Sequence, residues 1–191
     1  MGKTRLEAFS DAVLAIIITI MVLELRAPHE TDLAALRPLL PVLLSYALSF
    51  VYLGIYWNNH HHMLHCISRV TGGILWANLY LLFWLSLVPF VTAWMGENNF
   101  AALPMAAYGV VLLMSAVAFT ILVYTLIALH GRTSALAMAL GRDYKGKTSL
   151  VCYALAIPLA FVSPWLAGAL YVFVAFLWLV PDARIEKTLF P

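Results

Sequence analysis

The chain has 191 residues, of which 64% are hydrophobic and only 10% are charged, and its formal net charge is +2. A soluble domain carries roughly 25% charged residues and about half apolar residues. This composition therefore excludes a soluble globular protein, because the apolar surplus must face lipid or other membrane helices. The lipid bilayer is the expected environment, and no nucleic-acid partner is expected.

Six stretches of the sequence are apolar enough to cross a bilayer, for which a helix needs about 20 apolar residues. In chain order, we place these spans at Ala8–Leu25, Leu39–Tyr56, Ile74–Trp94, Ala101–Leu129, Leu150–Val162 and Trp165–Val180. Only Ser163–Pro164 separates the last two, so one long kinked helix there would give five spans instead. Pro89 and Pro158 lie within spans and should kink them. Residues 1–191 are expected to form a single all-α membrane domain.

The distribution of positive charge favours six spans. With six, one side of the membrane holds the N-terminus, the second-to-third connection, the fourth-to-fifth loop and the C-terminus. The Lys and Arg residues on that side are Lys3, Arg5, Arg69, Arg132, Arg142, Lys145, Lys147, Arg184 and Lys187. The other side holds only Arg26 and Arg37, whereas five spans would move Arg184 and Lys187 across. Because positive residues concentrate on the cytoplasmic side, we expect both termini in the cytoplasm.

The first span differs from the others because its uncharged stretch is short. It runs from Ala12 to Leu23, which is roughly 18 Å of helix against a hydrocarbon core of ~30 Å. A charge inside that core costs at least ~2.5–3.5 kcal/mol and normally has a partner. We therefore expect protein or water around this helix, and we expect Arg5 to pair with Asp11.

One face of the first span is aliphatic. Ile16, Ile20 and Leu23 recur at i, i+4 and i+7 and so form one stripe, which Thr19 borders. The acidic group of Asp11 points away from this stripe. Two interpretations fit the pattern, namely ordinary packing against neighbouring helices and the lining of a pore.

A histidine cluster follows the second span, at His60, His61, His62 and His65. His61 and His65 are spaced i, i+4, which can bind zinc on one helix face. The sequence shows no E-x-x-H partner and no nearby carboxylate or thiol pattern, so no metal site is expected. Hydrogen bonding within the helix bundle and pH sensing are the interpretations that stay open.

The N-terminal residues Arg5, Phe9, Ser10 and Asp11 match the R-x-x-x-F-S-D signature of the transmembrane protein 175 family. This family comprises the endolysosomal potassium channels of animals and their shorter prokaryotic relatives. The position of the match at the start of the first span and the His- and Trp-rich segment 56–62 add to the resemblance. A single six-helix unit resembles the prokaryotic form, so we expect a multi-pass protein of a prokaryotic cell membrane.

The resemblance implies a homotetramer in which the four first helices surround a central pore, without a re-entrant pore loop. It implies that Ile16 forms the constriction, that Ile20 and Leu23 form further rings, and that Thr19 helps to coordinate the ion. The permeant ion would be potassium, with weak selectivity because no carbonyl cage replaces the hydration shell. No cofactor and no catalytic residue are implied.

The resemblance also implies that Arg5, Ser10 and Asp11 tie the first helix to the second and third. The candidate partners of these signature residues are Trp57, His60, His61 and Asn78.

Two other functional classes were weighed against a channel. A small proton-coupled secondary transporter could use Asp11 and the cluster from His60 to His65 as a proton relay. A membrane-embedded hydrolase would need a nucleophile and a base at one depth. The sequence contains neither G-x-S-x-G nor H-E-x-x-H, so we expect no enzyme.

Overall fold

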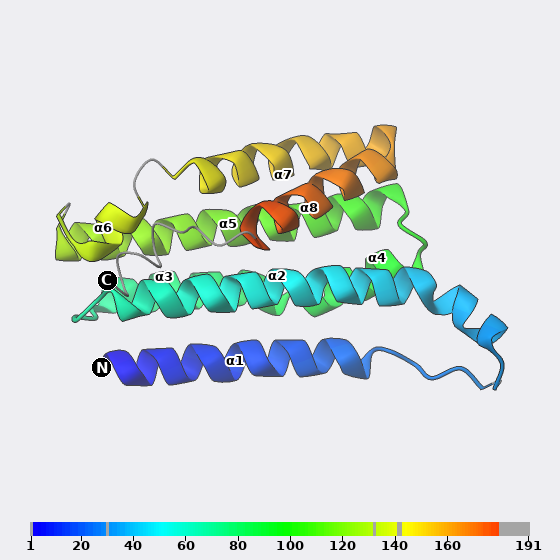
Figure 1. The fold of residues 1–191 in the computed structure, drawn as a ribbon, viewed down its shortest axis with the longest axis horizontal. Helices are drawn as coiled ribbons and strands as arrows, with labels where there is room; N and C mark the ends of the chain where they lie inside the picture. The colour runs from blue at the N-terminus through cyan, green and yellow to red at the C-terminus, as the bar shows by residue number, and fades with distance from the viewer. Residues whose placement is uncertain (1, 30, 132, 141–142, 180–191) are drawn as a thin grey trace.

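The computed structural model describes residues 2–29, 31–131, 133–140 and 143–179. All the regular elements within these ranges are helices. In chain order they are α1 (Lys3–Leu23), the 3-10 helix η1 (Leu33–Leu39), α2 (Leu40–His65), α3 (Gly72–Ser86), α4 (Val88–Glu97), α5 (Ala102–His130), α6 (Ala135–Leu140), α7 (Tyr144–Val162) and α8 (Pro164–Leu179). Figure 1 shows the long helices running side by side.

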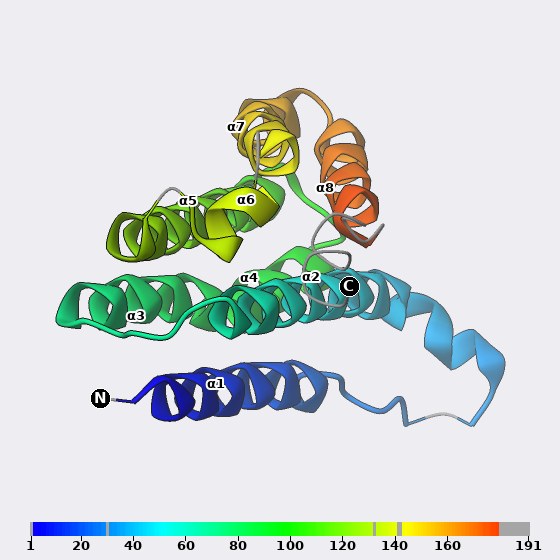
Figure 2. The ribbon, with the colours of Figure 1, turned by 60° about the vertical axis from the view of Figure 1, so that its left-hand side comes forward.

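Within the described residues, five helical segments are long and apolar enough to cross a bilayer, and α8 is a shorter apolar helix. The helices α7 and α8 form an antiparallel hairpin (Figures 1 and 2). The turn between them is at Ser163, whose backbone is extended. The sequence-based choice of two short helices in this region, in place of one kinked helix, is therefore confirmed.

The third expected span is divided at Leu87. The helix α3 ends at Ser86 and α4 begins at Val88. Pro89 occupies one of the first two positions of α4, where the missing backbone N–H leaves no hydrogen bond unmade. The kink expected at Pro89 is confirmed, in the form of a break between two helices.

Several helix ends differ from the expected span ends. The helix α2 continues to His65 rather than ending near Tyr56, so the whole histidine cluster is helical. The helix α7 begins at Tyr144, before the expected start at Leu150. Other residues used in the span and charge arguments lie outside the described residues, namely Arg132, Arg142, Val180, Arg184 and Lys187.

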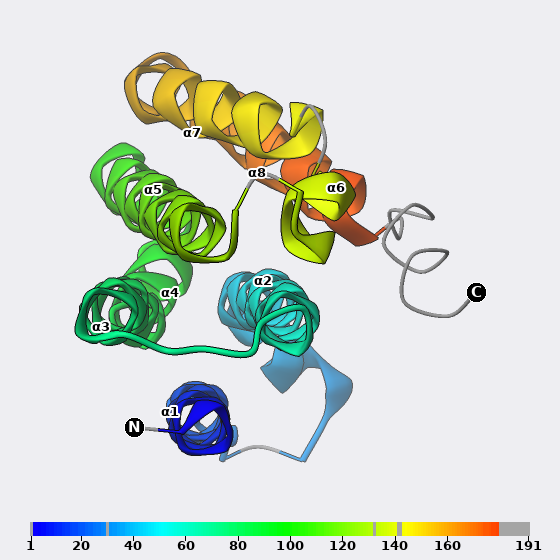
Figure 3. The ribbon, with the colours of Figure 1, turned by 90° about the vertical axis from the view of Figure 1, so that its left-hand side faces the viewer.

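The helix α1 lies at one edge of the bundle, where it packs against α2, α3 and α4 (Figure 3). The helix α5 packs against α3 and α7, and α8 packs against α7, α2 and α5. The N-terminus, the α2–α3 connection and α6 share one end of the molecule, and η1 lies at the other end (Figure 1). This arrangement leaves one long side of α1 without a neighbour among the described residues.

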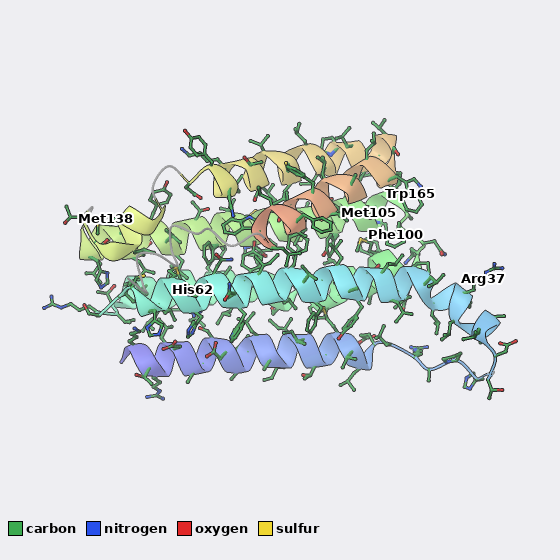
Figure 4. The ribbon with its side chains drawn as sticks, viewed as in Figure 1. Arg37, His62, Phe100, Met105, Met138 and Trp165 are labelled. Atoms are coloured by element: carbon green, nitrogen blue, oxygen red, sulfur yellow. The ribbon has the colours of Figure 1, made fainter. Side chains whose placement is uncertain are left out.

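Tyrosine hydroxyls join the helices in the middle of the bundle. The hydroxyl of Tyr52 on α2 donates to the carbonyl oxygen of Tyr171 on α8 at 2.6 Å. The hydroxyl of Tyr171 donates in turn to the carbonyl oxygen of Met105 on α5 at 2.9 Å. Near Met105, the rings of Phe100 and Trp165 lie 5.9 Å apart at one end of the bundle (Figure 4). These two bonds satisfy the buried hydroxyls of Tyr52 and Tyr171 within the bundle, as an apolar environment requires.

Candidate pore face and its supporting network

The helix α1 has a buried face and an exposed face. The buried face consists of residues spaced three or four apart, namely Leu6, Ser10, Leu14, Ile17 and Met21. This spacing places them on one side of a helix, and that side contacts the bundle. Residues on the opposite side have no neighbour within the described part of the chain.

The aliphatic stripe expected from the sequence lies on the exposed face. The exposed fractions of Ile16, Ile20 and Leu23 are 56%, 42% and 80%. Phe9, a residue of the N-terminal signature, is also exposed, at 47%. A single chain therefore presents an apolar surface along α1 that no other part of the described chain covers.

Thr19 is the polar residue on this exposed face. Its hydroxyl donates to the carbonyl oxygen of Ile16 at 2.8 Å. Because that bond uses the only hydrogen of the hydroxyl, the lone pairs of Oγ1 remain as acceptors. The chemistry of this group suits contact with a cation.

Behind the apolar face, a buried chain of hydrogen bonds connects α1, α3 and α2. The side-chain amide of Asn78 donates to Oγ of Ser10 at 3.0 Å, and Ser10 donates to the carbonyl oxygen of Leu6 at 2.9 Å. Oδ1 of Asn78 lies 2.8 Å from Nε2 of His60. Asn78 and Ser10 are fully buried and His60 is nearly so. This network fixes the rotation of α1 relative to α2 and α3.

The network also determines the tautomer of His60. Since the Asn78 amide donates to Ser10, Oδ1 of Asn78 must be the acceptor toward His60, and Nε2 of His60 carries the proton. Nδ1 of His60 is buried and has no hydrogen-bond partner among the described residues.

A second set of contacts joins α1 to α2 near the N-terminus. Nε1 of Trp57 donates to Oδ1 of Asp11 at 3.1 Å. Nδ1 of His61 lies 3.4 Å from Oε1 of Glu7. Nζ of Lys3 lies 3.5 Å from the carbonyl oxygen of His65. These contacts recur every four residues along both antiparallel helices, and we call them the α1–α2 seam.

The seam corrects one expectation and adds residues that the sequence did not reveal. Asp11 pairs with Trp57, so the expected pairing of Arg5 with Asp11 is wrong, and no salt bridge of Arg5 occurs among the described residues. The roles of Lys3 and Glu7 were missed. The sequence did contain a signal for these roles, because Lys3, Glu7 and Asp11 have the same four-residue spacing as Trp57, His61 and His65.

The proposed partners of the signature residues are therefore brought together in pairs. Ser10 meets Asn78, Asn78 meets His60, and Asp11 meets Trp57. His61 contacts Glu7 rather than a signature residue.

The histidines His61, His62 and His65 of α2, which are partly or fully exposed, pack ring against ring. The ring centroid of His61 lies 5.2 Å from that of His65 and 6.2 Å from that of Trp57. No group of three His, Cys, Asp or Glu side chains in the described ranges is placed to hold a metal ion. Figure 4 shows His62 on the same stretch of α2.

Comparison with known proteins relates this arrangement to a channel family. Residues 5–89 match the family model described as endosomal/lysosomal potassium channel TMEM175. A potassium channel of Chryseobacterium sp. strain P1-3 is 53% identical over 189 residues, covering 99% of this chain and 98% of the relative. A potassium channel of Streptomyces collinus is 33% identical over 123 residues, covering 60% of each chain.

A solved structure has the same fold. The crystal structure of a lysosomal potassium-selective channel TMEM175 homologue from Chamaesiphon minutus superposes with a TM-score of 0.81 and 27% sequence identity. The superposition covers 93% of this chain and 96% of that structure's chain. Together with the signature at the start of α1 and the full-length bacterial relative, this shows that the chain belongs to the TMEM175 family of potassium channels.

Proposed function

We propose that this chain is one subunit of a homotetrameric, weakly potassium-selective cation channel in a prokaryotic cell membrane, with both termini in the cytoplasm. The α1 helices of four subunits line the central pore. The observation that carries the proposal is the uncovered face of α1, which presents Ile16, Ile20 and Leu23 with Thr19 among them. The bacterial relatives described as potassium channels support the choice of ion.

Lipid alone is a poor environment for α1. Its uncharged stretch from Ala12 to Leu23 spans roughly 18 Å, and the exposed residues Arg5 and Glu24 stand at either side of it. Placing such groups in hydrocarbon costs ~2.5–3.5 kcal/mol each. A water-filled axis relieves this cost for the polar residues, and contact with other subunits covers the apolar ones. One helix cannot enclose a pore, so closed rotational symmetry among identical chains must supply the rest.

The proposed mechanism of gating and selection uses the rings that symmetry would create. Four Ile16 side chains form a narrow aliphatic constriction, which stops conduction by dewetting when it is narrow. An ion that passes loses part of its hydration shell there, and potassium gives up its water more readily than sodium. Thr19 lies roughly 4.5 Å further along the helix axis and offers its oxygen to the partly dehydrated ion. Selection by such a ring is modest.

Bilayer recording tests this function directly. The purified chain in planar bilayers, with potassium on one side and sodium on the other, should give discrete current steps. The reversal potential should favour potassium over sodium and allow some sodium current. A smooth, saturating flux that depends on a proton gradient would instead identify the proton-coupled transporter, and it would overturn the channel proposal.

A further inference from the structure

A cavity opens on the side of α2 that faces away from α1. Its volume is about 70 Å³, and residues of α2, α5, α7 and α8 line it, together with Asp143 just before α7. At 100° per residue, the lining residues Tyr52, Tyr56 and Asn59 point away from Trp57 and His61, which form the α1–α2 seam. The cavity is therefore separate from the proposed pore face.

Aromatic side chains form much of the cavity wall. Tyr52, Tyr56, Phe119, Tyr153 and Trp178 contribute rings from all four helices. The rings of Tyr56 and Phe119 meet edge to face with centroids 6.0 Å apart. The ammonium of Lys145 already lies 5.9 Å from the ring centroid of Trp178. The ring of Trp178 thus already has a cation over it, and the rings of Tyr56, Phe119 and Tyr153 remain as π faces that suit an ammonium group.

The polar groups of the cavity include the oxygen acceptors of Asp143 and Asn59 and the hydroxyl groups of Tyr56 and Tyr124. Asp143 is partly buried, and its Oδ1 accepts from the backbone N–H of Gly146 at 3.1 Å. The amide of Asn59 donates to the carbonyl oxygen of Ile55, which leaves the amide oxygen free to accept. The indole N–H of Trp178 is already used, because it donates to Oγ of Ser149 at 2.8 Å. A ligand here meets oxygen acceptors and π faces.

Among the described residues, the carboxylate of Asp143 has the Gly146 N–H and the charge of Lys147 as its favourable partners. Burial raises the pKa of Asp143, against the lowering effects of the Gly146 N–H and of Lys147. No salt bridge to Asp143 occurs among the residues that the structure describes. A bound cation would neutralise this partly buried carboxylate, so the site favours positive over neutral ligands.

We propose that this cavity binds a small organic ammonium ion, with its apolar body between the aromatic walls and its ammonium group against Asp143. An acyl chain would need only the apolar walls, and an anion would be repelled by the Asp143 carboxylate. The observations favour a cation over both.

The test compares probes of one shape and different charge. Benzylammonium, benzyl alcohol and benzoate are titrated into the full-length, detergent-solubilised protein at neutral pH, and ligand-observed NMR measures binding above that of empty micelles. Benzylammonium should bind at least about tenfold more tightly than benzyl alcohol, and benzoate should bind most weakly. Equal binding of the cation and the alcohol would overturn the proposal, as would preferential binding of benzoate.

Matched variants locate the bound probe. Asp143→Asn keeps the helix-capping oxygen and tolerates the positive φ of 41° at this position. It should abolish the preference for benzylammonium. The control is Asp32→Asn. Asp32 also caps a helix, because its side chain accepts from the N–H of Ala35, and its substitution should leave benzylammonium binding unchanged. Equal benzylammonium affinities for wild type and both variants would overturn the proposal.

A cavity-filling variant provides a second test that does not depend on Asp143. Thr120 lines the cavity, and its hydroxyl only bonds to the carbonyl oxygen of Ala116 within the same helix. Thr120→Leu should weaken both benzylammonium and benzyl alcohol, because the new side chain occupies their volume. Unchanged benzylammonium binding in this variant would place the probe elsewhere and overturn the proposal.

Discussion

Asn78 connects three helices through one side chain. Its amide donates to Ser10 on α1, and its carbonyl oxygen accepts from His60 on α2. Both Asn78 and Ser10 have an exposed fraction of 0%, so no water replaces a lost partner. Removing one partner therefore leaves a buried polar group unsatisfied, which costs more than the net value of the bond.

The Ser10–Asn78 bond can be tested with a double-mutant cycle. Ser10→Ala and Asn78→Ala should each lower the free energy of unfolding by about 1–3 kcal/mol. The double variant should lose less than the sum, because the two residues share one network. Ser86→Ala is the control, since the exposed Ser86 hydroxyl bonds only to Phe83 in its own helix. Denaturant unfolding in micelles provides the measurement, and strictly additive losses would contradict the shared network.

Thr19 is the residue at which ion selection is predicted to change. Thr19→Val keeps the shape of the side chain and removes the oxygen, so the potassium/sodium permeability ratio should fall. The matched control is Thr125→Val on α5, because Thr125 is partly exposed and its hydroxyl also donates to a carbonyl oxygen of its own helix, at 2.7 Å. Reversal potentials under a potassium/sodium gradient provide the measurement. Equal potassium/sodium permeability ratios in the two variants would show that Thr19 takes no part in ion selection.

At the scale of elements, α2 and α4 approach closely at Gly96. A Cβ atom at Gly96 would lie 2.7 Å from the Cα atom of Val42, a backbone atom that cannot move without shifting the helix. A Cβ atom at Gly54 on α2 would meet nothing within 4 Å. Alanine substitutions at the two glycines therefore separate the effect of close packing from the effect of helix propensity.

Gly96→Ala should destabilise the protein by about 1–3 kcal/mol, because it forces α2 and α4 apart. Gly54→Ala should be neutral or slightly stabilising, since alanine favours a helix by roughly 1 kcal/mol over glycine. Thermal unfolding of both variants in the same micelles compares them. A stabilising Gly96→Ala would contradict the close approach.

The α1–α2 seam is predicted to support assembly and gating rather than ion selection. Asp11→Ala removes the acceptor for the indole N–H of Trp57 and loosens α1 on its support. It should lower the tetramer fraction or the open probability and leave the potassium/sodium ratio unchanged. Asp11→Asn keeps an acceptor oxygen and should show a smaller effect. Native mass spectrometry measures the tetramer fraction, and bilayer recording measures the open probability and the potassium/sodium permeability ratio. A changed permeability ratio with normal assembly would contradict the prediction.

At the scale of the whole molecule, the hydropathy of the sequence predicted the apolar helices and most of their order along the chain. The hairpin of α7 and α8 followed from Ser163–Pro164, and the break near Pro89 followed from the missing N–H of proline. The helical extension of α2 through the histidines did not follow, because polar residues end a hydropathy signal without ending a helix. The aliphatic stripe of α1 followed from the spacing of Ile16, Ile20 and Leu23, but its exposure did not, because the same spacing also fits packing against neighbouring helices.

The partners of the polar residues were harder to predict. The three-helix network around Asn78 was expected only from the family resemblance, since contacts between α1 and α3 depend on packing that local sequence does not encode. The predicted pairing of Arg5 with Asp11 was wrong. The prediction assumed a partner on the same helix, whereas the carboxylate of Asp11 accepts from the indole N–H of Trp57 on α2. The aromatic cavity between α2, α5, α7 and α8 was not predicted, since its walls come from segments far apart in the chain.

The central proposal is a pore lined by the α1 face at Ile16. The most direct measurement is planar-bilayer recording of wild type and Ile16→Asn under a potassium/sodium gradient. Ile121→Asn on α5 is the control, because Ile121 has a similar exposed fraction of 45% and lies away from α1. The account predicts potassium-favouring wild-type steps, with larger current or lost selectivity only in Ile16→Asn. Wild-type steps that Ile16→Asn leaves unchanged, or no current from folded oligomers, would contradict a pore lined by α1.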